Sequence, residues 1–235
     1  MNIRVVITCE HGGNSIPGRY RSFFVGCSAL LKTHRGWDPG AAAMARELSQ
    51  GMGAPLFEST VSRLLVDLNR SLGHPRLFSE MTRGAPPAAR EEILERYYRP
   101  FRDQVEHSIA SSVAQGNAVI HISSHSFSSQ LAGKRRNADI GLLYDPARSF
   151  EADLCGRWQK ALELDAPDLT VRRNYPYSGK SDGFTKALRL RFPDPAYAGV
   201  ELEINQKHFF AGGSRWRALR RAVLEAARSS IGDGQ

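Results

Sequence analysis

Short apolar runs rich in β-branched residues alternate along this chain with segments of helical periodicity, and this alternation limits the fold more than any other feature. Runs with strand character cover residues 3–8, 64–68, 118–123, 140–144, 169–172 and 199–204. Helical periodicity covers residues 40–50, 88–114, 150–164, 184–191 and 215–230. Strands that alternate with helices predict an α/β fold, with a mixed, mostly parallel sheet covered by helices on both faces.

The chain length of 235 residues fits one sizeable hydrophobic core. We find no internal repeat, no low-complexity tract and no long linker; residues 84–87, with the letters GAPP, are expected to form a loop before a helix. The sequence therefore predicts a single domain over residues 1–235.

The net charge of +8 at pH 7, from 32 Lys and Arg against 24 Asp and Glu, raises the possibility of a nucleic-acid partner. However, the basic residues are scattered, and no basic run is interleaved with aromatic residues. The arginines at 215–228 are most simply a solvated helix face. We therefore expect no nucleic acid, although some arginines could line a pocket for an anionic substrate.

The cysteine count and the absence of long apolar segments exclude other classes. Three scattered cysteines form neither a disulfide framework nor a CxxC zinc motif. No apolar run reaches 18 residues, and the N-terminus enters a strand-like run without a signal-peptide core. We expect a cytoplasmic protein without a membrane partner; the oligomeric state is left open.

Polar side chains follow the apolar runs where strands of such a sheet end, which is where open α/β sheets bind ligands. In chain order these residues are His11, Asp67, Asn69, Arg70, His125, Glu201, Glu203 and Asn205. Two histidines, several carboxylates and an arginine at one edge of a sheet are the composition of a divalent-metal site with an acid/base and an anion anchor.

Several of these residues also have structural interpretations. His121 lies inside its strand and is expected to be structural, whereas His125 lies at a strand exit among small serines that leave room for a metal. Asp38 precedes Pro39 and could cap the following helix, which does not prevent it from being a ligand. Arg70 could pair with Asp67.

Glu201 and Glu203 share one face of a predicted strand because side chains alternate along it. Both could be edge charges, but a carboxylate inside the apolar run GVELEI is costly unless it has a partner.

The motifs HGGNSIP, RGWDPGA, SRLLVDLNRS, SSHSF, NYPYSG and VELEINQ occur in this order between about residues 5 and 209. The ordered set resembles the N-formylglutamate amidohydrolases, also called N-formylglutamate deformylases, a family related in fold to the zinc carboxypeptidases. The resemblance implies a mixed α/β sheet, a metal held by two histidines and a carboxylate, and a glutamate that activates water.

Transferred to this chain, the resemblance implies that His11 and His125 are metal ligands. The carboxypeptidases have a ligand glutamate three residues after the first histidine, where this chain has Asn14, so Asp38 is the candidate for the third ligand. The Asn69–Arg70 pair resembles the pair that binds a substrate carboxylate in the carboxypeptidases. Glu203 resembles their general base, with Glu201 as the competing choice.

The chemistry of the residues agrees with this assignment. Three protein ligands on Zn²⁺ leave a position for water, and the same set would also suit Fe, Co or Mn. Arg63 could stabilise an oxyanion or a substrate carboxylate. Residues 172–184 are expected to form a mobile loop over the pocket, where Arg173, Tyr177 or Lys180 could meet a second carboxylate. Residues 134–141 could supply another contact to an anion, although a basic surface loop is the preferred expectation.

The resulting hypothesis is a metal-dependent amidohydrolase that cleaves a small N-acyl amino acid. The resemblance implies N-formyl-L-glutamate, with formate and L-glutamate as products, as in histidine degradation. The alternatives are a carboxypeptidase-like or other amidase that acts on a peptide or cell-wall fragment, and a non-catalytic protein that binds anions or nucleic acid.

Overall fold

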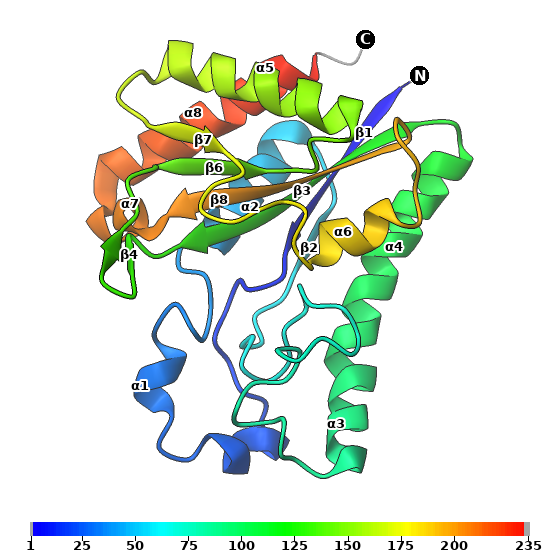
Figure 1. Cartoon of the computed structure of the whole chain (residues 1–235), viewed down its shortest axis with the longest axis vertical. Coiled ribbons are helices and arrows are strands. Elements are labelled where there is room, and N and C mark those ends of the chain that lie inside the picture. Colours follow the sequence, from blue (N-terminus) through cyan, green and yellow to red (C-terminus); the bar gives the residue numbers. More distant parts are fainter. Residues whose placement is uncertain (1, 233–235) are drawn as a thin grey trace.

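The computed structural model describes residues 2–232, and its centre is a six-stranded sheet in the order β2–β1–β3–β8–β6–β7 (Figure 1). Its strands are β1 (Ile3–Cys9), β2 (Leu56–Glu58), β3 (Ala118–Phe127), β6 (Ile140–Leu143), β7 (Val171–Arg173) and β8 (Tyr197–Asn205). The first four in this order are parallel, and β6 and β7 run in the opposite direction. The predicted mixed, mostly parallel sheet is confirmed.

Helices cover both faces of the sheet, as the alternating pattern predicts (Figure 1). One face packs against α2 (Ala41–Met52), α5 (Ser149–Asp165) and α8 (Gly213–Ile231), which surround an apolar core that contains Trp158 and Met44. The other face packs against α4 (Arg99–Ala114) and α6 (Phe184–Arg189). Together they form a single α/β domain.

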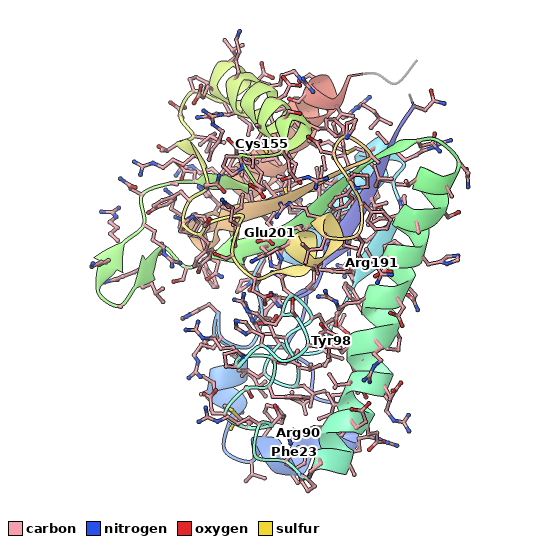
Figure 2. All side chains as sticks on the ribbon, turned by 45° about the vertical axis from the view of Figure 1, so that its right-hand side comes forward. Phe23, Arg90, Tyr98, Cys155, Arg191 and Glu201 are labelled. Carbon is pink, nitrogen blue, oxygen red and sulfur yellow. The ribbon has the colours of Figure 1, made fainter. Side chains whose placement is uncertain are left out.

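A lobe with its own apolar cluster extends from the sheet at the bottom of Figure 1. It contains the 3-10 helix η1 (Gly18–Phe24), α1 (Ser28–Leu31), α3 (Pro87–Ile93) and the π-helical turn η2 (Leu94–Tyr98). Because α3, η2 and α4 are continuous, the helix predicted over residues 88–114 is confirmed, with a π turn inside it. Figure 2 labels Phe23, Arg90 and Tyr98 in this lobe.

The strand predicted over residues 64–68 is wrong, because this segment forms turns in the lobe. Its side chains at 64, 65, 66 and 68 are buried in the lobe's apolar cluster, which explains the apolar run. Its backbone forms hydrogen bonds without a neighbouring strand. The Leu65 amide donates to the Ser62 carbonyl, and the Thr82 hydroxyl donates to the Leu64 and Leu65 carbonyls. An apolar run identifies burial but does not identify a strand partner.

Other elements differ from the sequence expectations in extent. Strand β3 continues through His125 to Phe127, and β8 begins at Tyr197. Six short elements were not expected from the sequence: η1, α1, β2, α7 (Gln206–Ala211), and the hairpin of β4 (Gln130–Leu131) and β5 (Lys134–Arg135). Within residues 2–232, no helix has both the length and the apolar character needed to cross a membrane.

Candidate active site

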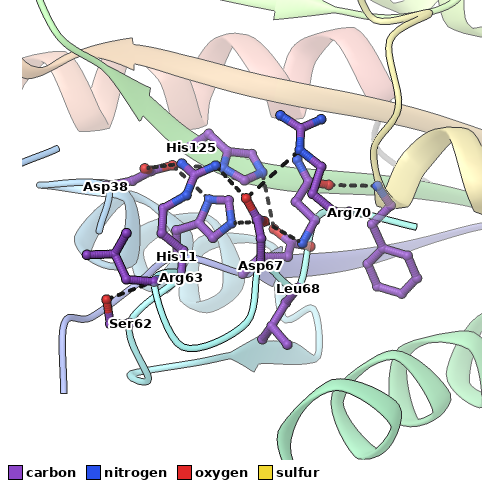
Figure 3. Close-up of polar contacts among 12 residues, drawn as sticks. His11, Asp38, Ser62, Arg63, Asp67, Leu68, Arg70 and His125 are labelled. Carbon is purple, nitrogen blue, oxygen red and sulfur yellow. Dashed lines mark hydrogen bonds and ion pairs between the residues drawn. The ribbon is translucent and has the colours of Figure 1, made fainter. Parts of the chain in front are cut away.

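His11, Asp38 and His125 meet at the edge of the sheet that faces the lobe (Figure 3). His11 lies two residues beyond β1, Asp38 lies in the turn before α2, and His125 belongs to β3 rather than to the loop after it. The Oδ2 atom of Asp38 lies 3.3 Å from His11 Nδ1 and 2.9 Å from His125 Nδ1. All three side chains are buried, and their nearest donor atoms lie within 4.8 Å of one another.

The local backbone brings His11 and Asp38 together. The Asp38 amide donates to the His11 carbonyl at 2.9 Å. Gly13 allows this loop to pack against residue 60, because a Cβ at position 13 would lie 2.4 Å from the Thr60 carbonyl oxygen. The glycine thus allows a close backbone contact that holds this loop in place.

The capping role considered for Asp38 is not present. Helix α2 begins at Ala41 with Gly40 as its N-cap, and no side chain caps it. The Asp38 carboxylate instead faces the histidines and Arg63, whose Nη1 lies 3.2 Å from Oδ1. Burial disfavours its charge, but His11, His125 and Arg63 more than offset this and hold the pKa of Asp38 well below its ordinary value.

Two imidazole nitrogens and one carboxylate oxygen that face the same point are a donor set that fits Zn²⁺ and related divalent cations. Asn14, three residues after His11, does not join this cluster, because its side chain donates to the Leu31 carbonyl at 3.0 Å. The described residues that could hold a metal here are therefore His11, Asp38 and His125.

The second nitrogen of each histidine faces another buried carboxylate. His11 Nε2 lies 2.7 Å from Asp67 Oδ1, and His125 Nε2 lies 3.2 Å from Glu10 Oε2. Burial disfavours the Asp67 charge, but Arg63 and His11 hold the pKa of Asp67 well below its ordinary value. From the sequence, Asp67 was expected only as a possible partner of Arg70, and Glu10 was not predicted as a site residue. Such carboxylates orient metal-binding histidines.

Glu203 lies next to His125 on the neighbouring strand, because these two residues are register partners in the β3–β8 pair. Its side chain is 6% exposed, and its Oε2 accepts no hydrogen bond from residues 2–232. Burial, reinforced by Asp38 and Glu201, raises the pKa of Glu203 to about 8. Glu201 lies two residues away on the same face, and its Oε1 accepts a hydrogen bond from Thr185 at 2.9 Å.

The raised pKa of Glu203 predicts how a Glu203→Gln variant responds to pH. The folded chain holds this proton more tightly than the unfolded chain, so the stabilising contribution is full at acidic pH and is lost as pH rises toward 8. We expect the chelator-treated Gln variant to unfold at the same temperature as wild type or higher above pH 8. Thermal unfolding from pH 5 to 9 measures this, and a lower unfolding temperature for the variant at pH 9 would contradict it.

Three further predicted residues line the same region. Arg63, with its side chain 26% exposed, lies 2.8 Å from Asp67 Oδ2 through Nη2 in addition to its contact with Asp38. Arg70 Nη1 donates to the Asp182 carbonyl at 2.5 Å, and Asn69 Oδ1 accepts from the Phe184 amide at 2.6 Å. The Asn–Arg pair thus also anchors the segment before α6. Arg70 lies 3.9 Å from Asp67, so its expected pairing with that residue is loose.

A cavity of about 640 Å³ opens above these side chains. Glu201, a residue of β8 that is labelled at the sheet in Figure 2, lies in its wall. The lining residues are His11, Asp38, Arg63, Asn69, Arg70, His74, Pro75, Arg76, His125, Ser126, Leu131, Tyr177, Ser178, Ser181, Asp182, Glu201 and Glu203. Cationic groups and carboxylates thus face one volume of a size suited to a small ligand.

The segment 172–184 covers one side of this cavity, as expected, but hydrogen bonds fix it at several points. Asn174 Oδ1 accepts from the Gly179 and Tyr144 amides, and Arg189 Nη1 donates to the Gly179 carbonyl. Tyr177 lies in the cavity wall, and its hydroxyl accepts from Arg136 Nη1 at 3.0 Å.

Arg173 and Lys180, the other candidates for a second substrate carboxylate, do not belong to the cavity lining. Arg173 instead points to Tyr144, with its Nη1 3.4 Å from the tyrosine hydroxyl. The structure places His74 and Arg76 in the lining in their stead.

The mixed α/β sheet thus carries a His–Asp–His cluster beside a buried glutamate and several arginines, which are side chains that suit hydrolytic chemistry. Residues 3–210 match the family model of the N-formylglutamate amidohydrolases, and the chain belongs to this family. No curated protein matches the chain significantly.

Solved structures with the same fold include a gene product of Agrobacterium tumefaciens, 30% identical, with a TM-score of 0.83 over 97% of this chain and 90% of that one. The N-formylglutamate amidohydrolase of Ralstonia eutropha JMP134 is 18% identical, with a TM-score of 0.72 over 98% of this chain and 93% of that one. A metallo-carboxypeptidase of Burkholderia cenocepacia matches at a TM-score of 0.43 and 18% identity, over 98% of this chain and 56% of that one.

Proposed function

We propose that this chain is a metal-dependent amidohydrolase that converts N-formyl-L-glutamate to formate and L-glutamate. The observation that carries the proposal is the convergence of His11, Asp38 and His125 beside the buried Glu203 in a cavity lined with arginines. The family supports N-formylglutamate as the substrate.

His11, Asp38 and His125 would hold the cation, and a bound Zn²⁺ or similar ion would supply Lewis-acid polarisation of the substrate carbonyl and a lower pKa for water. Glu203 is the residue we propose as general base. It takes a proton from the attacking water and delivers it to the leaving amine nitrogen. The absence of any hydrogen bond to its Oε2 from the described residues supports this choice, whereas Glu201 is already bonded to Thr185.

The arginines of the cavity account for an anionic substrate. We assign Asn69 and Arg70 to the α-carboxylate, because a guanidinium binds a carboxylate through two parallel hydrogen bonds. Arg63 stabilises the developing oxyanion from its position between Asp38 and Asp67. The second carboxylate of the substrate is assigned to Tyr177 together with His74 and Arg76, which lie in the same lining.

Replacing Arg70 by Lys is expected to raise KM for N-formyl-L-glutamate by about 10-fold or more, with a smaller change in kcat. Lysine keeps the charge but loses the paired donors, so ground-state and transition-state binding weaken together. Steady-state kinetics measure the split. The exposed Arg83, outside the cavity lining, offers a matched control as Arg83→Lys. An Arg70→Lys variant with the KM of wild type would exclude Arg70 from the substrate site.

A substrate panel tests the function as a whole. The purified chain, supplied with Zn²⁺, Co²⁺ or Mn²⁺, is given N-formyl, N-acetyl and longer N-acyl derivatives of glutamate, aspartate and neutral amino acids, together with small peptides and cell-wall fragments. We expect the highest kcat/KM for N-formyl-L-glutamate. Activity confined to peptides or cell-wall fragments would replace this proposal by a different amidase, and salt-sensitive binding of DNA or RNA without hydrolysis would replace it by a binding protein.

A further inference from the structure

Glu10 connects His125 to a series of hydrogen-bonded polar side chains that are buried in the sheet region. Glu10 directly follows β1, and its completely buried side chain contacts that of Thr8. Glu10 Oε1 accepts from the Thr8 hydroxyl at 2.6 Å, and Oε2 accepts from the Ser123 hydroxyl at 2.7 Å. His125 Nε2 lies 2.9 Å from the Ser123 oxygen and 3.2 Å from Glu10 Oε2.

The direction of these hydrogen bonds determines where the proton of His125 lies. Ser123 has one hydroxyl proton, and it is donated to Glu10, so the serine oxygen can only accept from His125. Both oxygens of the Glu10 carboxylate already accept a hydroxyl proton, Oε1 from Thr8 and Oε2 from Ser123. Both neighbours of His125 Nε2 are therefore acceptors, and Nε2 must carry a proton.

The same reasoning extends the chain to Tyr197. Thr8 donates its proton to Glu10, so it accepts from His121 Nε2 at 2.8 Å, and His121 Nδ1 then accepts from the Tyr197 hydroxyl at 2.8 Å. Burial lowers the pKa of His121 to about 4, which agrees with a neutral ring. His121 is thus the far end of the support for Glu10.

We propose that Glu10 is a positioning residue that fixes the orientation and the Nε2-protonated tautomer of His125, so that the Nδ1 lone pair points at the cation site. The inference rests on the proposed function for the presence of a cation. His11 has the same arrangement, with Nδ1 toward Asp38 and Nε2 toward the carboxylate of Asp67. A single buried charge behind each histidine thus orients both rings toward one point.

The negative charge of Glu10 separates the positioning of His125 from a role in which Glu10 only accepts hydrogen bonds from buried hydroxyls. A buried carboxylate costs more free energy than an amide of the same shape. The Thr8 and Ser123 hydroxyls would be satisfied by glutamine as well, because an amide accepts and donates hydrogen bonds. A full negative charge strengthens the hydrogen bonds that Glu10 accepts, and of these donors only the N–H of His125 belongs to a residue proposed to bind the cation.

The test compares Glu10→Gln with Thr8→Val. The first variant removes the charge and keeps the shape, whereas the second cuts the link to His121 and keeps the charge. We expect Glu10→Gln to weaken Zn²⁺ binding about 10–100-fold, the usual effect of losing such a partner, and Thr8→Val to bind Zn²⁺ close to wild type. Competition with a chromophoric chelator measures the dissociation constants, and thermal unfolding of the metal-free proteins measures stability separately.

The outcomes separate the two proposals. Wild type that binds none of Zn²⁺, Co²⁺ and Mn²⁺ would overturn the proposed function, and with it a role of Glu10 toward a cation. Wild type that binds Zn²⁺ while Glu10→Gln binds equally well, or while both variants lose affinity equally, would overturn the role of Glu10 alone.

If Glu10→Gln does not fold, the wild-type protein still gives an answer. Long-range ¹H–¹⁵N spectra of the Zn²⁺-loaded chain report which nitrogen of His125 carries the proton. A proton on Nε2 is expected, and a proton on Nδ1 would overturn the proposal.

Discussion

Turnover of N-formyl-L-glutamate by a Glu203→Gln variant is expected to fall about 10²–10⁴-fold in kcat, the range for loss of a positioned general base. An amide can occupy the place of the carboxylate beside His125 but cannot take a proton from water at neutral pH. The buried Oε2 has no other partner among residues 2–232, so the carboxylate is free to act on a bound water. Metal content should remain that of wild type, because Glu203 is outside the His–Asp–His cluster.

Glu201→Gln is the matched control, since it changes the same functional group two residues along the same strand face. The Glu201 carboxylate already accepts a hydrogen bond from Thr185, so we expect a much smaller loss of kcat. Steady-state kinetics with elemental analysis of each preparation decide between them. If Glu201→Gln were inactive and Glu203→Gln active, the roles of the two glutamates would be exchanged.

The pKa of Glu203 also bears on its assignment. Burial raises the pKa to about 8 in the metal-free chain, which would leave much of the group protonated at neutral pH. A divalent cation bound beside it would favour the charged form and lower this pKa. We therefore expect Glu203 to be ionised at neutral pH, as a general base must be, only when a cation is bound beside it.

The alternating pattern predicted the mixed sheet and both covering layers, and the convergence of strand ends predicted that His11 and His125 lie near each other. Asp38, which follows no strand, was implied only by the family resemblance, and the structure brings it to the two histidines. The sequence was not sufficient for the segment 64–68, whose apolar side chains are buried without a strand partner. Local periodicity reports which side chains are buried, but the identity of the neighbouring backbone depends on the whole fold.

The contribution of Glu10 was missed for a different reason. Glu10 lies between the apolar run at 3–8 and the motif that begins with His11, and neither pattern includes it. A period of two relates His121, Ser123 and His125, and the same period relates Thr8 to Glu10. This alternation predicts that polar side chains share one face of adjacent strands, although the distances that join them come only from the structure.

The location of Arg173 could not be predicted from composition. A loop rich in Gly, Ser and Tyr beside a site suggests a flexible cover, but the Asn174 and Arg189 contacts fix its backbone and direct Arg173 away from the cavity. The side chains that a loop presents to a cavity depend on such anchors. The basic residues of the cavity instead include Arg76, from a segment of the lobe that the sequence left without a role.

A His125→Ala variant is expected to lose its bound metal and, with it, hydrolysis down to the background rate. Wild type should carry about one cation per chain, because three protein ligands are the usual set of a catalytic site. Removal of the His125 imidazole leaves only two metal ligands. It also removes the group that contacts two buried carboxylates, Asp38 and Glu10.

His121, the other histidine of β3, provides the control for the loss of metal from His125→Ala. His121 lies on the same face of β3, four residues before His125, and contacts Thr8 and Tyr197 rather than Asp38. His121→Gln should lower the unfolding temperature yet retain the cation, whereas His125→Ala should lose the cation even where it remains folded. Elemental analysis of the three proteins after dialysis with Zn²⁺ measures this. Equal metal content in wild type and His125→Ala would move the cation site elsewhere, and no metal in any of them would exclude the proposed metal-dependent function.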